Sequence, residues 1–317
     1  MKLVTFKNNA GESRIGWLQE SEVVDMNLAD ASLPTEMLSF IDDHEKYFEI
    51  IKSLGAVSPH YKIEDIELLA PLPNPRSFRD FVAFEEHMLN AGKSFGTQVS
   101  PVWYDIPIFY FTNHQAIYGP NDDIAGPEKE DKLDMELELA AIIGKKGQNI
   151  KVEDAEDYIF GYTVFNDWSA RTIQRAEMTV PLGPNKGKDF ANTIGPCIIT
   201  KDEMEQYRCT ITRELHPEHL AMPPKTEGRF DLKMSARING NTICEGNYKT
   251  VYWTFAQMIE RASENKVNLM PGDILGSGTV GWGSLVENDF STHRPLQPGD
   301  VVELEIEGIG VLKNRVV

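Results

Sequence analysis

The sequence is poor in positive charge and in cysteine. Its 317 residues include 31 Lys and Arg against 49 Asp and Glu, which gives a net charge of −18. This excess of acid argues against a nucleic-acid-binding protein, because affinity for nucleic acid depends on cationic contacts with phosphates. Only three cysteines occur (Cys197, Cys209 and Cys244), and no two of them form a CxxC pair. A disulfide framework and a thiolate zinc site are therefore excluded, and we expect a reducing, cytoplasmic setting.

Long apolar runs are also absent. No stretch approaches the roughly 20 apolar residues that a membrane-spanning helix needs, and Met1–Val4 has the pattern of a strand and not of a signal peptide. We therefore expect no association with a membrane. Hydrophobic residues make up 41% of the chain and charged residues 25%, which excludes wholesale disorder and allows one large domain or two ordinary ones.

The first part of the chain has the pattern of a small α+β unit. Two short apolar segments flank a polar turn near residue 10, which predicts a hairpin. Residues 35–54 then carry apolar side chains at close to 3.6-residue spacing, which predicts one amphipathic helix that ends at Gly55. A proline-rich stretch at residues 71–75 marks a rigid boundary. We therefore predict a small N-terminal α+β domain of residues 1–66 and a second domain of residues 67–317.

Patterns typical of β-strands dominate the second domain. Asn239-Gly240 lies between two alternating segments, which is a strong signal for a type I′ hairpin. Helical periodicity returns only in short pieces, notably Phe255–Asn265. The polar residues 201–229 have the composition of a loop insertion. The second domain is therefore predicted to be mainly β with a few helices, in a mixed sandwich or barrel.

The strongest candidate for chemistry is the strictly alternating segment Leu133–Leu139. In one strand its apolar residues would face one side, and Asp134, Glu136 and Glu138 would face the other. Glu136 and Glu138 would then lie about 6.6 Å apart at the backbone, which lets both carboxylates reach one ion. The alternative is a half-exposed strand with a solvated acidic face. The apolar sequel Ala140–Ile143 favours a buried strand, and oxygen ligands would select Mg²⁺, Mn²⁺ or Ca²⁺ over zinc.

Two further acidic residues have suggestive neighbours. Asp80 precedes His87 by seven residues, so a helix would place both on one face, two turns apart. Asp167 follows the apolar segment Tyr162–Phe165 and precedes a segment with a helical pattern. There it could project into a cleft, or it could act only as the N-cap of the helix. The residues alone leave both interpretations of Asp167 open.

Together these segments resemble the fumarylacetoacetate hydrolase (fumarylacetoacetase) family over roughly residues 68–317. The matching motifs are Leu133–Leu139, Asn166-Asp-Trp-Ser-Ala-Arg171, Pro181-Leu-Gly-Pro184 with Gly187-Lys188, and Gly276-Ser-Gly-Thr279 with Gly283–Glu287. The resemblance implies that one Mg²⁺, Mn²⁺ or Ca²⁺ ion is bound by four carboxylates, those of Asp80, Glu136, Glu138 and Asp167. It also implies a mixed β-sandwich or roll as the catalytic domain, and a homodimer that acts on a small-molecule diketo acid.

The same resemblance assigns the other site residues. The residues implied in catalysis are His87, Glu287, Lys188, Arg171 and Gln174, and those implied in substrate binding are Thr279 and Lys93. His87 falls at the position of the catalytic base, and Glu287 falls at that of its glutamate partner. Lys188, Arg171 and Gln174 could donate hydrogen bonds to the oxyanion that develops on the substrate. Lys93 is the only cation in the segment that follows the histidine, where it could meet a substrate carboxylate.

One position separates the branches of this family. Members that hydrate or decarboxylate keto acids tend to place a glutamate three residues after the histidine, where this chain has Asn90. The partner glutamate is instead Glu287, as in the hydrolases of the fumarylacetoacetase type. We therefore predict a metal-dependent hydrolase that cleaves a carbon–carbon bond in acylpyruvate-like or fumarylacetoacetate-like diketo acids, with His87 activating water.

Two alternatives stay open. On the same fold, the chain could decarboxylate oxaloacetate, or hydrate or isomerise an enoic keto acid. It could also be a non-catalytic, oligomeric metal-binding protein, which predicts the loss of His87, Glu287 or Lys188, and all three are present. The family tyrosine that contacts substrate two residues after Asp80 is replaced by Val82, so the exact substrate is not predicted.

Overall fold

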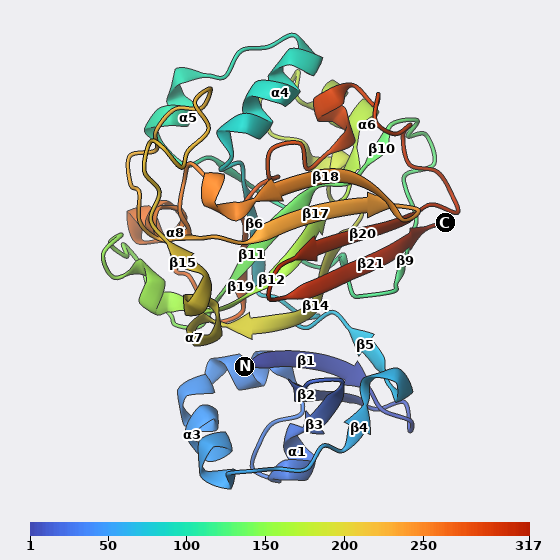
Figure 1. Cartoon of the computed structure of the whole chain (residues 1–317), viewed down its shortest axis with the longest axis vertical. Coiled ribbons are helices and arrows are strands. Elements are labelled where there is room, and N and C mark those ends of the chain that lie inside the picture. The colour runs from blue at the N-terminus through green and yellow to red at the C-terminus, as the bar shows by residue number, and fades with distance from the viewer.

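The structure, a computed structural model, describes residues 1–317 as two large β-sheets with short helices around them (Figure 1). The strands are β1 (Lys2–Lys7), β2 (Ser13–Gln19), β3 (Glu22–Asp25), β4 (Tyr61–Lys62), β5 (Glu67–Leu69), β6 (Ser77–Phe81), β7 (Phe109–Phe111), β8 (Ile117–Tyr118), β9 (Asp123–Ile124), β10 (Leu133–Asp134), β11 (Leu137–Ile143), β12 (Ile159–Asp167), β13 (Ser169–Ala170), β14 (Asn192–Thr200), β15 (Arg208–Cys209), β16 (Arg229–Phe230), β17 (Lys233–Ile238), β18 (Asn241–Asn247), β19 (Asp273–Gly276), β20 (Val301–Ile306) and β21 (Gly310–Val316). The α-helices are α1 (Met26–Ala29), α2 (Met37–Asp42), α3 (His44–Leu54), α4 (Glu85–Phe95), α5 (Pro101–Asp105), α6 (Arg171–Glu177), α7 (Lys201–Met204) and α8 (Phe255–Ser263).

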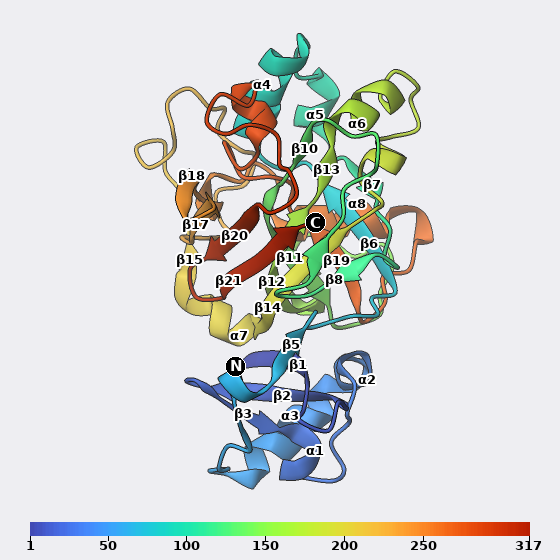
Figure 2. The ribbon, with the colours of Figure 1, turned by 90° about the vertical axis from the view of Figure 1, so that its right-hand side faces the viewer.

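The two large sheets pack face to face. A twelve-stranded sheet has the order β4-β3-β2-β1-β14-β12-β11-β19-β6-β7, with β5 beside β1 and β8 beside β14, and a five-stranded sheet has the order β18-β17-β20-β21-β9. Both views show β17, β20 and β21 lying across β11, β12 and β14 (Figures 1 and 2). The largest apolar cluster has 50 buried residues and contains side chains from both sheets, among them Leu139, Val164 and Leu304. The predicted fold class, mainly β with a few helices, is confirmed.

The N-terminal residues form the outer strands of the large sheet, with three helices beside them. The predicted hairpin is present as the pairing of β1 with β2. The single amphipathic helix expected over residues 35–54 is wrong, because α2 and α3 are separate helices that meet at Asp43, whose φ of −126° and ψ of 31° are not helical. Two consecutive aspartates, Asp42 and Asp43, stand at this break, and aspartate has a low helix propensity because its side chain competes for backbone hydrogen bonds.

The sheet continues across the boundary that the prolines suggested. β1 pairs with β14 through Lys2 with Ile199 and Leu3 with Ile198. A second apolar cluster of 20 buried residues also joins the N-terminal helices to the face of the large sheet. The division of the chain into domains 1–66 and 67–317 stays a prediction. None of the helices has the length and apolar composition that crossing a membrane requires.

An aromatic cluster ties the N-terminal helices to β12. The Phe160 ring lies 6.2 Å from that of Phe40, 5.2 Å from that of His44 and 6.1 Å from that of Phe48, measured between centroids. We expect Phe160→Ala to lower the free energy of unfolding by about 3–5 kcal/mol, because it leaves a cavity in a packed apolar cluster. Urea denaturation measures the change, and Phe111→Ala, at a side chain that is 61% exposed, is the control. Equal stability of the two variants would contradict this packing.

The buried carboxylate of Asp300 makes the free energy of unfolding depend on pH in the acid range. Burial alone would raise the pKa of Asp300, but hydrogen bonds from Arg294 and Asn239 outweigh burial and lower that pKa from 3.8 to about 2. A depressed folded-state pKa stabilises the protein above pH 4, and this contribution is lost as the pH falls toward 2. Because Arg294 is half-exposed, we expect Asp300→Asn to cost only about 1–2 kcal/mol at pH 7. Denaturation between pH 7 and pH 2.5 should show this difference shrinking with acid, and a pH-independent difference would refute it.

Candidate active site and metal centre

Four acidic side chains converge at one end of the large sheet. Asp80 lies near the end of β6, and Asp167 ends β12. Glu136 immediately precedes β11, and Glu138 is the second residue of that strand. One carboxylate oxygen from each of the four lies within 4.8 Å of those of the others, and all four residues are buried. The predicted set of metal-binding carboxylates is therefore brought together. Helices α4, α5 and α6 lie at this end of the molecule, opposite the N-terminal helices (Figures 1 and 2).

Two local predictions about these residues are wrong. The segment Leu133–Leu139 is not one strand, because β10 ends at Asp134 and β11 begins at Leu137. The Glu136 N–H donates to the Asn166 side chain, which takes the backbone out of regular pairing at this point. Asp134 is not one of the four clustered acids, and the Arg171 guanidinium bridges it to Glu136.

Asp80 and His87 do not share a helix. Asp80 belongs to β6, which pairs with β19 and β7, whereas His87 lies in α4. Asp167 is not a helix N-cap either, because Ala170 holds that position on α6. Of the two interpretations of Asp167, the one in which it faces the cleft therefore agrees with the structure.

A glycine between the acidic strands makes room for the cluster. Gly276 of β19 lies opposite Asp80 on one side and Ala140 of β11 on the other. A Cβ atom at this position would lie 2.3 Å from Asp80 Oδ1 and 3.1 Å from Glu138 Oε2. Any other residue would push the carboxylates apart. The site therefore requires glycine at this position, between the two acidic strands.

The chemistry of this cluster fits a divalent cation. Three buried oxygens, Asp80 Oδ1, Glu138 Oε1 and Asp167 Oδ1, have no hydrogen-bond partner. Burial and the neighbouring carboxylates raise the pKa of Asp80 and of Glu138 well above the usual range. A buried group of acids of this kind needs a compensating positive charge, and an all-oxygen donor set suits Mg²⁺, Mn²⁺ or Ca²⁺. The four predicted ligands therefore provide a credible site for such an ion.

Two buried cations border the cluster. Lys188 Nζ lies 2.6 Å from Glu136 Oε2 and 2.6 Å from Asp167 Oδ2. Arg171 Nη2 lies 2.7 Å from Glu136 Oε1 and 2.8 Å from Asp134 Oδ2. Burial alone would raise the pKa of Glu136, but Lys188 and Arg171 outweigh burial and lower it. Glu136 is therefore held as a carboxylate, with its charge shared between the two cations.

The predicted base and its partner are also in contact. His87 Nδ1 lies 2.9 Å from Glu287 Oε1, at ion-pair distance, although the ring nitrogen is not aligned for a regular hydrogen bond. Glu287 is held by backbone N–H groups of Trp282 and Ser284 and by the side chain of Asn90. These donors hold the carboxylate in place. It can therefore orient the imidazole and stabilise the protonated form of that ring.

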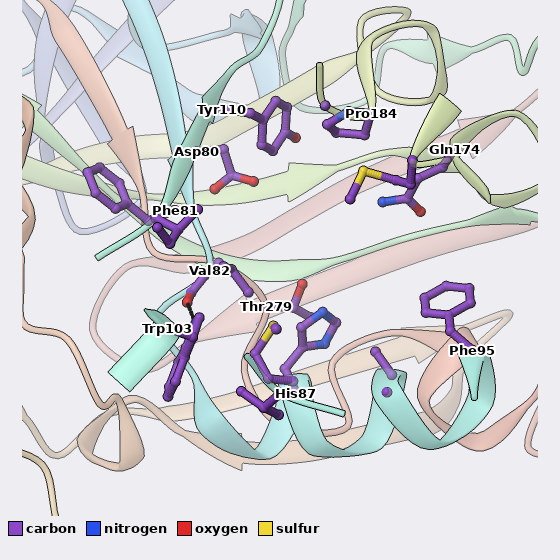
Figure 3. A pocket seen from close by; sticks show the side chains of 18 of the residues that line it. Asp80, Phe81, Val82, His87, Phe95, Trp103, Tyr110, Gln174, Pro184 and Thr279 are labelled. Carbon is purple, nitrogen blue, oxygen red and sulfur yellow. Dashed lines mark hydrogen bonds between the residues drawn. The ribbon is translucent and has the colours of Figure 1, made fainter. Parts of the chain in front are cut away.

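A cavity of about 580 Å³ opens beside these groups. The predicted residues that line it are Asp80, His87, Glu136, Glu138, Arg171, Gln174, Lys188 and Thr279. Figure 3 shows His87 rising from α4 toward Thr279, with Asp80 and Gln174 on the opposite side. Lys93 is exposed and does not line the cavity, so the structure does not bring it together with the other predicted site residues.

Two supporting residues escaped the sequence analysis. The Tyr110 hydroxyl donates to Asp167 Oδ2 at 2.5 Å, and Tyr110 lies opposite Asp80 in the pairing of β6 with β7. Asp134 accepts hydrogen bonds from Arg171 Nε and from two backbone N–H groups, and thereby positions the guanidinium. The only sign of Tyr110 in the sequence was a hydroxyl within the aromatic run Phe109–Phe111. Its role could not be predicted, because it depends on which strand lies beside β7.

Comparisons with known proteins agree with this site. The family model described as Fumarylacetoacetate (FAA) hydrolase C-terminal matches residues 76–317. The chain is 32% identical over 281 residues to the fumarylacetoacetase of Arabidopsis thaliana, covering 78% of this chain and 66% of that protein. It is also 32% identical over 326 residues to the mitochondrial oxaloacetate tautomerase fahd2 of Xenopus laevis, covering 100% of this chain and 90% of that protein.

Solved structures share the fold along the whole chain. The maleylpyruvate hydrolase of Sphingobium sp. SYK-6, in complex with manganese(II) and pyruvate, has a TM-score of 0.70 at 23% identity and covers 100% of this chain and 99% of that one. The 5-carboxymethyl-2-hydroxymuconate delta-isomerase of Mycobacterium smegmatis has a TM-score of 0.66 at 21% identity, with the same coverage. The matches to plant and human fumarylacetoacetases span only 61–66% of those proteins.

Proposed function

Because the chain belongs to the fumarylacetoacetate hydrolase family, we propose that it is a divalent-metal-dependent hydrolase of β-diketo acids. In the proposed reaction, R–CO–CH₂–CO–COO⁻ and water give R–COO⁻, H⁺ and CH₃–CO–COO⁻. Water adds to the acyl carbon, and the bond from that carbon to the CH₂ group breaks. The electron pair of this bond passes to the pyruvate half as an enolate, which then takes up a proton.

The observation that carries the proposal is the contact between His87 and Glu287. With Nδ1 directed to the carboxylate, Nε2 is available to accept a proton from the attacking water. Asn90 lies three residues after His87, at the position where hydratases and decarboxylases of the family tend to have a glutamate. Its amide donates to Glu287 at 3.2 Å, so a single carboxylate serves the histidine. This arrangement favours a hydrolase over those two classes.

The other side chains supply positive charge and hydrogen bonds where the enolate forms. A divalent cation held by Asp80, Glu136, Glu138 and Asp167 would polarise the substrate carbonyl groups. Lys188 and Arg171 are buried beside that cluster, and Thr279 and Gln174 line the same cavity. Fixed donors of this kind typically contribute about 3 kcal/mol each to stabilising an oxyanion.

A second candidate is keto–enol tautomerisation of oxaloacetate. The full-length likeness to the Xenopus laevis tautomerase favours it, since the fumarylacetoacetases match over a smaller part of both chains. The same base could transfer a proton between the carbon and the oxygen of the substrate without any attack by water. Decarboxylation of oxaloacetate, hydration or isomerisation of an enoic keto acid, and a non-catalytic, metal-binding role complete the set of alternatives.

Assembly and location belong to the proposal as well. We infer a homodimer in the cytoplasm that binds a small-molecule diketo acid and neither nucleic acid nor membrane. The three free cysteines support a reducing compartment, and the net charge of −18 argues against a polyanionic partner. Light scattering with size-exclusion chromatography measures the oligomeric state directly.

A substrate panel tests the proposed activity. Acylpyruvates, fumarylacetoacetate and oxaloacetate are incubated with the protein, with Mg²⁺ or Mn²⁺ present or with EDTA, and substrate absorbance and released pyruvate are followed. We expect metal-dependent loss of diketo-acid absorbance, with release of pyruvate from the acylpyruvates. Loss of the enol signal of oxaloacetate without cleavage would instead support the tautomerase, and release of carbon dioxide would support the decarboxylase. No turnover of any substrate would support the non-catalytic alternative.

A further inference from the structure

The cavity is charged at one end only. Its lining residues with acidic, basic or imidazole side chains are Asp80, His87, Glu136, Glu138, Arg171 and Lys188. All six belong to the metal cluster or to its immediate neighbours, and the other lining residues are uncharged. The part of the cavity that leads away from the cluster, which we call the distal lobe, is therefore free of fixed charge. In Figure 3, Phe95 lies along α4 on one side of His87, and Val82 and Trp103 lie on the other side.

Helix α4 sets the length of the distal lobe. His87, Ala91 and Phe95 follow at four-residue intervals, so they lie along one face of the helix and all three line the cavity. The helical rise places Phe95 about 12 Å beyond His87. Figure 3 shows His87 and Phe95 rising from the same side of α4. The lobe therefore begins beside the reacting groups and continues for two turns of the helix.

The walls of the cavity away from the cluster combine apolar side chains with the neutral polar side chains of Thr97, Gln98 and Ser100. The Trp103 indole N–H is already donated to the Val82 carbonyl at 2.6 Å. Ile108 and Met178 also line the cavity although they are 38% and 58% exposed. Large apolar side chains thus continue from the interior of the lobe to its mouth, where a free protein normally exposes few of them.

No cation is placed to receive a second carboxylate in the distal lobe. Arg171 and Lys188 are already paired with the acids of the cluster, and Lys93 lies outside the cavity. Arg175 packs on the Phe95 ring, 5.1 Å from the ring centroid, but it does not line the cavity either. A carboxylate on the far end of a substrate would therefore meet no cation among the lining residues, whereas an alkyl chain would contact Ala91 and Phe95.

Resting on the proposed function, we propose that the acyl half of the substrate is an apolar alkyl or aryl chain. The substrate is then a 2,4-dioxo monocarboxylate: its single carboxylate lies at the charged end of the cavity, and its hydrocarbon chain lies along α4. Diketo acids that carry a second carboxylate at the far end are selected against. Binding should tighten by about fourfold for each methylene group that the lobe buries.

A matched pair of non-cleavable probes tests this specificity without depending on turnover. The probes 2-oxooctanoate and 2-oxooctanedioate have the same length and differ in the terminal carboxylate, and neither has the second carbonyl group that cleavage needs. Calorimetry on the Mn²⁺-loaded protein should show tighter binding of the monocarboxylate by about fourfold or more. Equal binding, or tighter binding of the dicarboxylate, would overturn the proposal.

Variants at the far end of the lobe add an independent readout. Phe95→Lys should weaken binding of 2-oxooctanoate and strengthen that of 2-oxooctanedioate, whereas the matched variant Phe95→Leu should keep the preference for the monocarboxylate. Arg175→Gln should leave the ratio of the two affinities unchanged. A selective loss of dicarboxylate binding in Arg175→Gln would assign a carboxylate site to Arg175 and refute the apolar lobe.

These outcomes separate the inference from the proposed function. If the monocarboxylate probe binds preferentially but no 2,4-dioxo acid is cleaved, the apolar specificity holds and the hydrolase assignment fails. If diketo acids are cleaved but the ω-carboxylated ones are preferred over alkyl ones, the hydrolase assignment holds and the apolar specificity fails.

Discussion

Replacing His87 by alanine is expected to lower kcat by about 100- to 10,000-fold, the usual contribution of a positioned general base. The imidazole contacts Glu287, and it is not part of the cluster of four carboxylates. The affinity for divalent cations should therefore stay unchanged. Steady-state kinetics on the best diketo acid of the panel, with calorimetric titration of Mn²⁺, measures both quantities on the same preparation.

Two further variants make this result specific. Glu287→Gln keeps the size of the side chain but removes its charge, so it should also lower kcat, and the double variant should be little worse than His87→Ala because the two residues act as a unit. His219→Ala removes a histidine that is 64% exposed and should leave kcat unchanged. A collapse of Mn²⁺ affinity in His87→Ala would show that the histidine is a ligand and not the base.

Glu138→Gln is expected to abolish the response to divalent cations. Glu138 is fully buried, its Oε2 accepts from the Gly278 N–H at 2.8 Å, and its Oε1 has no partner. Glutamine keeps the acceptor for Gly278 but removes one of the negative charges that would bind the ion. Mn²⁺ affinity should fall by about 100-fold or more, since hard cations depend on the number of charged oxygen ligands, and activity should fall with it.

The same variant should be more stable than the wild type when no metal is present. Burial and neighbouring carboxylates raise the pKa of Glu138, which shows that its charge is unfavourable in the metal-free cluster. Removing the charge should stabilise the metal-free protein by about 1–3 kcal/mol. Mn²⁺ at 100 times its dissociation constant should stabilise only the wild type, by about 2.7 kcal/mol.

Thermal unfolding in EDTA and in Mn²⁺ tests both halves of this prediction. Glu214→Gln removes an exposed acid outside the cluster and should behave like the wild type in both conditions. Equal stabilisation of wild type and Glu138→Gln by Mn²⁺ would exclude Glu138 from the metal site.

The sequence predicted the members of the site better than their local structure. Motif order grouped Asp80, Glu136, Glu138 and Asp167, which the structure brings close together, whereas periodicity placed Asp80 on a helix and Glu136 within a strand. Periodicity reports only which side chains share a face of one element. The actual conformation at Asp80 depends on pairing with β19 and β7, which lie far away in the chain.

Residues whose role depends on tertiary contacts could not be found from the sequence alone. Tyr110 reaches Asp167 only because β7 pairs with β6. Gly276 matters because its strand separates two acidic strands. Lys93 follows His87 by six residues, which rotates it about 240° around the helix axis and away from the face that lines the cavity. Helix geometry could have excluded Lys93 once α4 was known to include both residues.

Isotope labelling tests the central claim most directly. A 2,4-dioxo acid is cleaved in H₂¹⁸O with Mn²⁺, and the two products are quantified by mass spectrometry. The account predicts equimolar pyruvate and carboxylic acid, with one ¹⁸O atom from water in the carboxylate of the acyl half, and no products in EDTA. Consumption of the enol form without any labelled acid would contradict hydrolysis at this site.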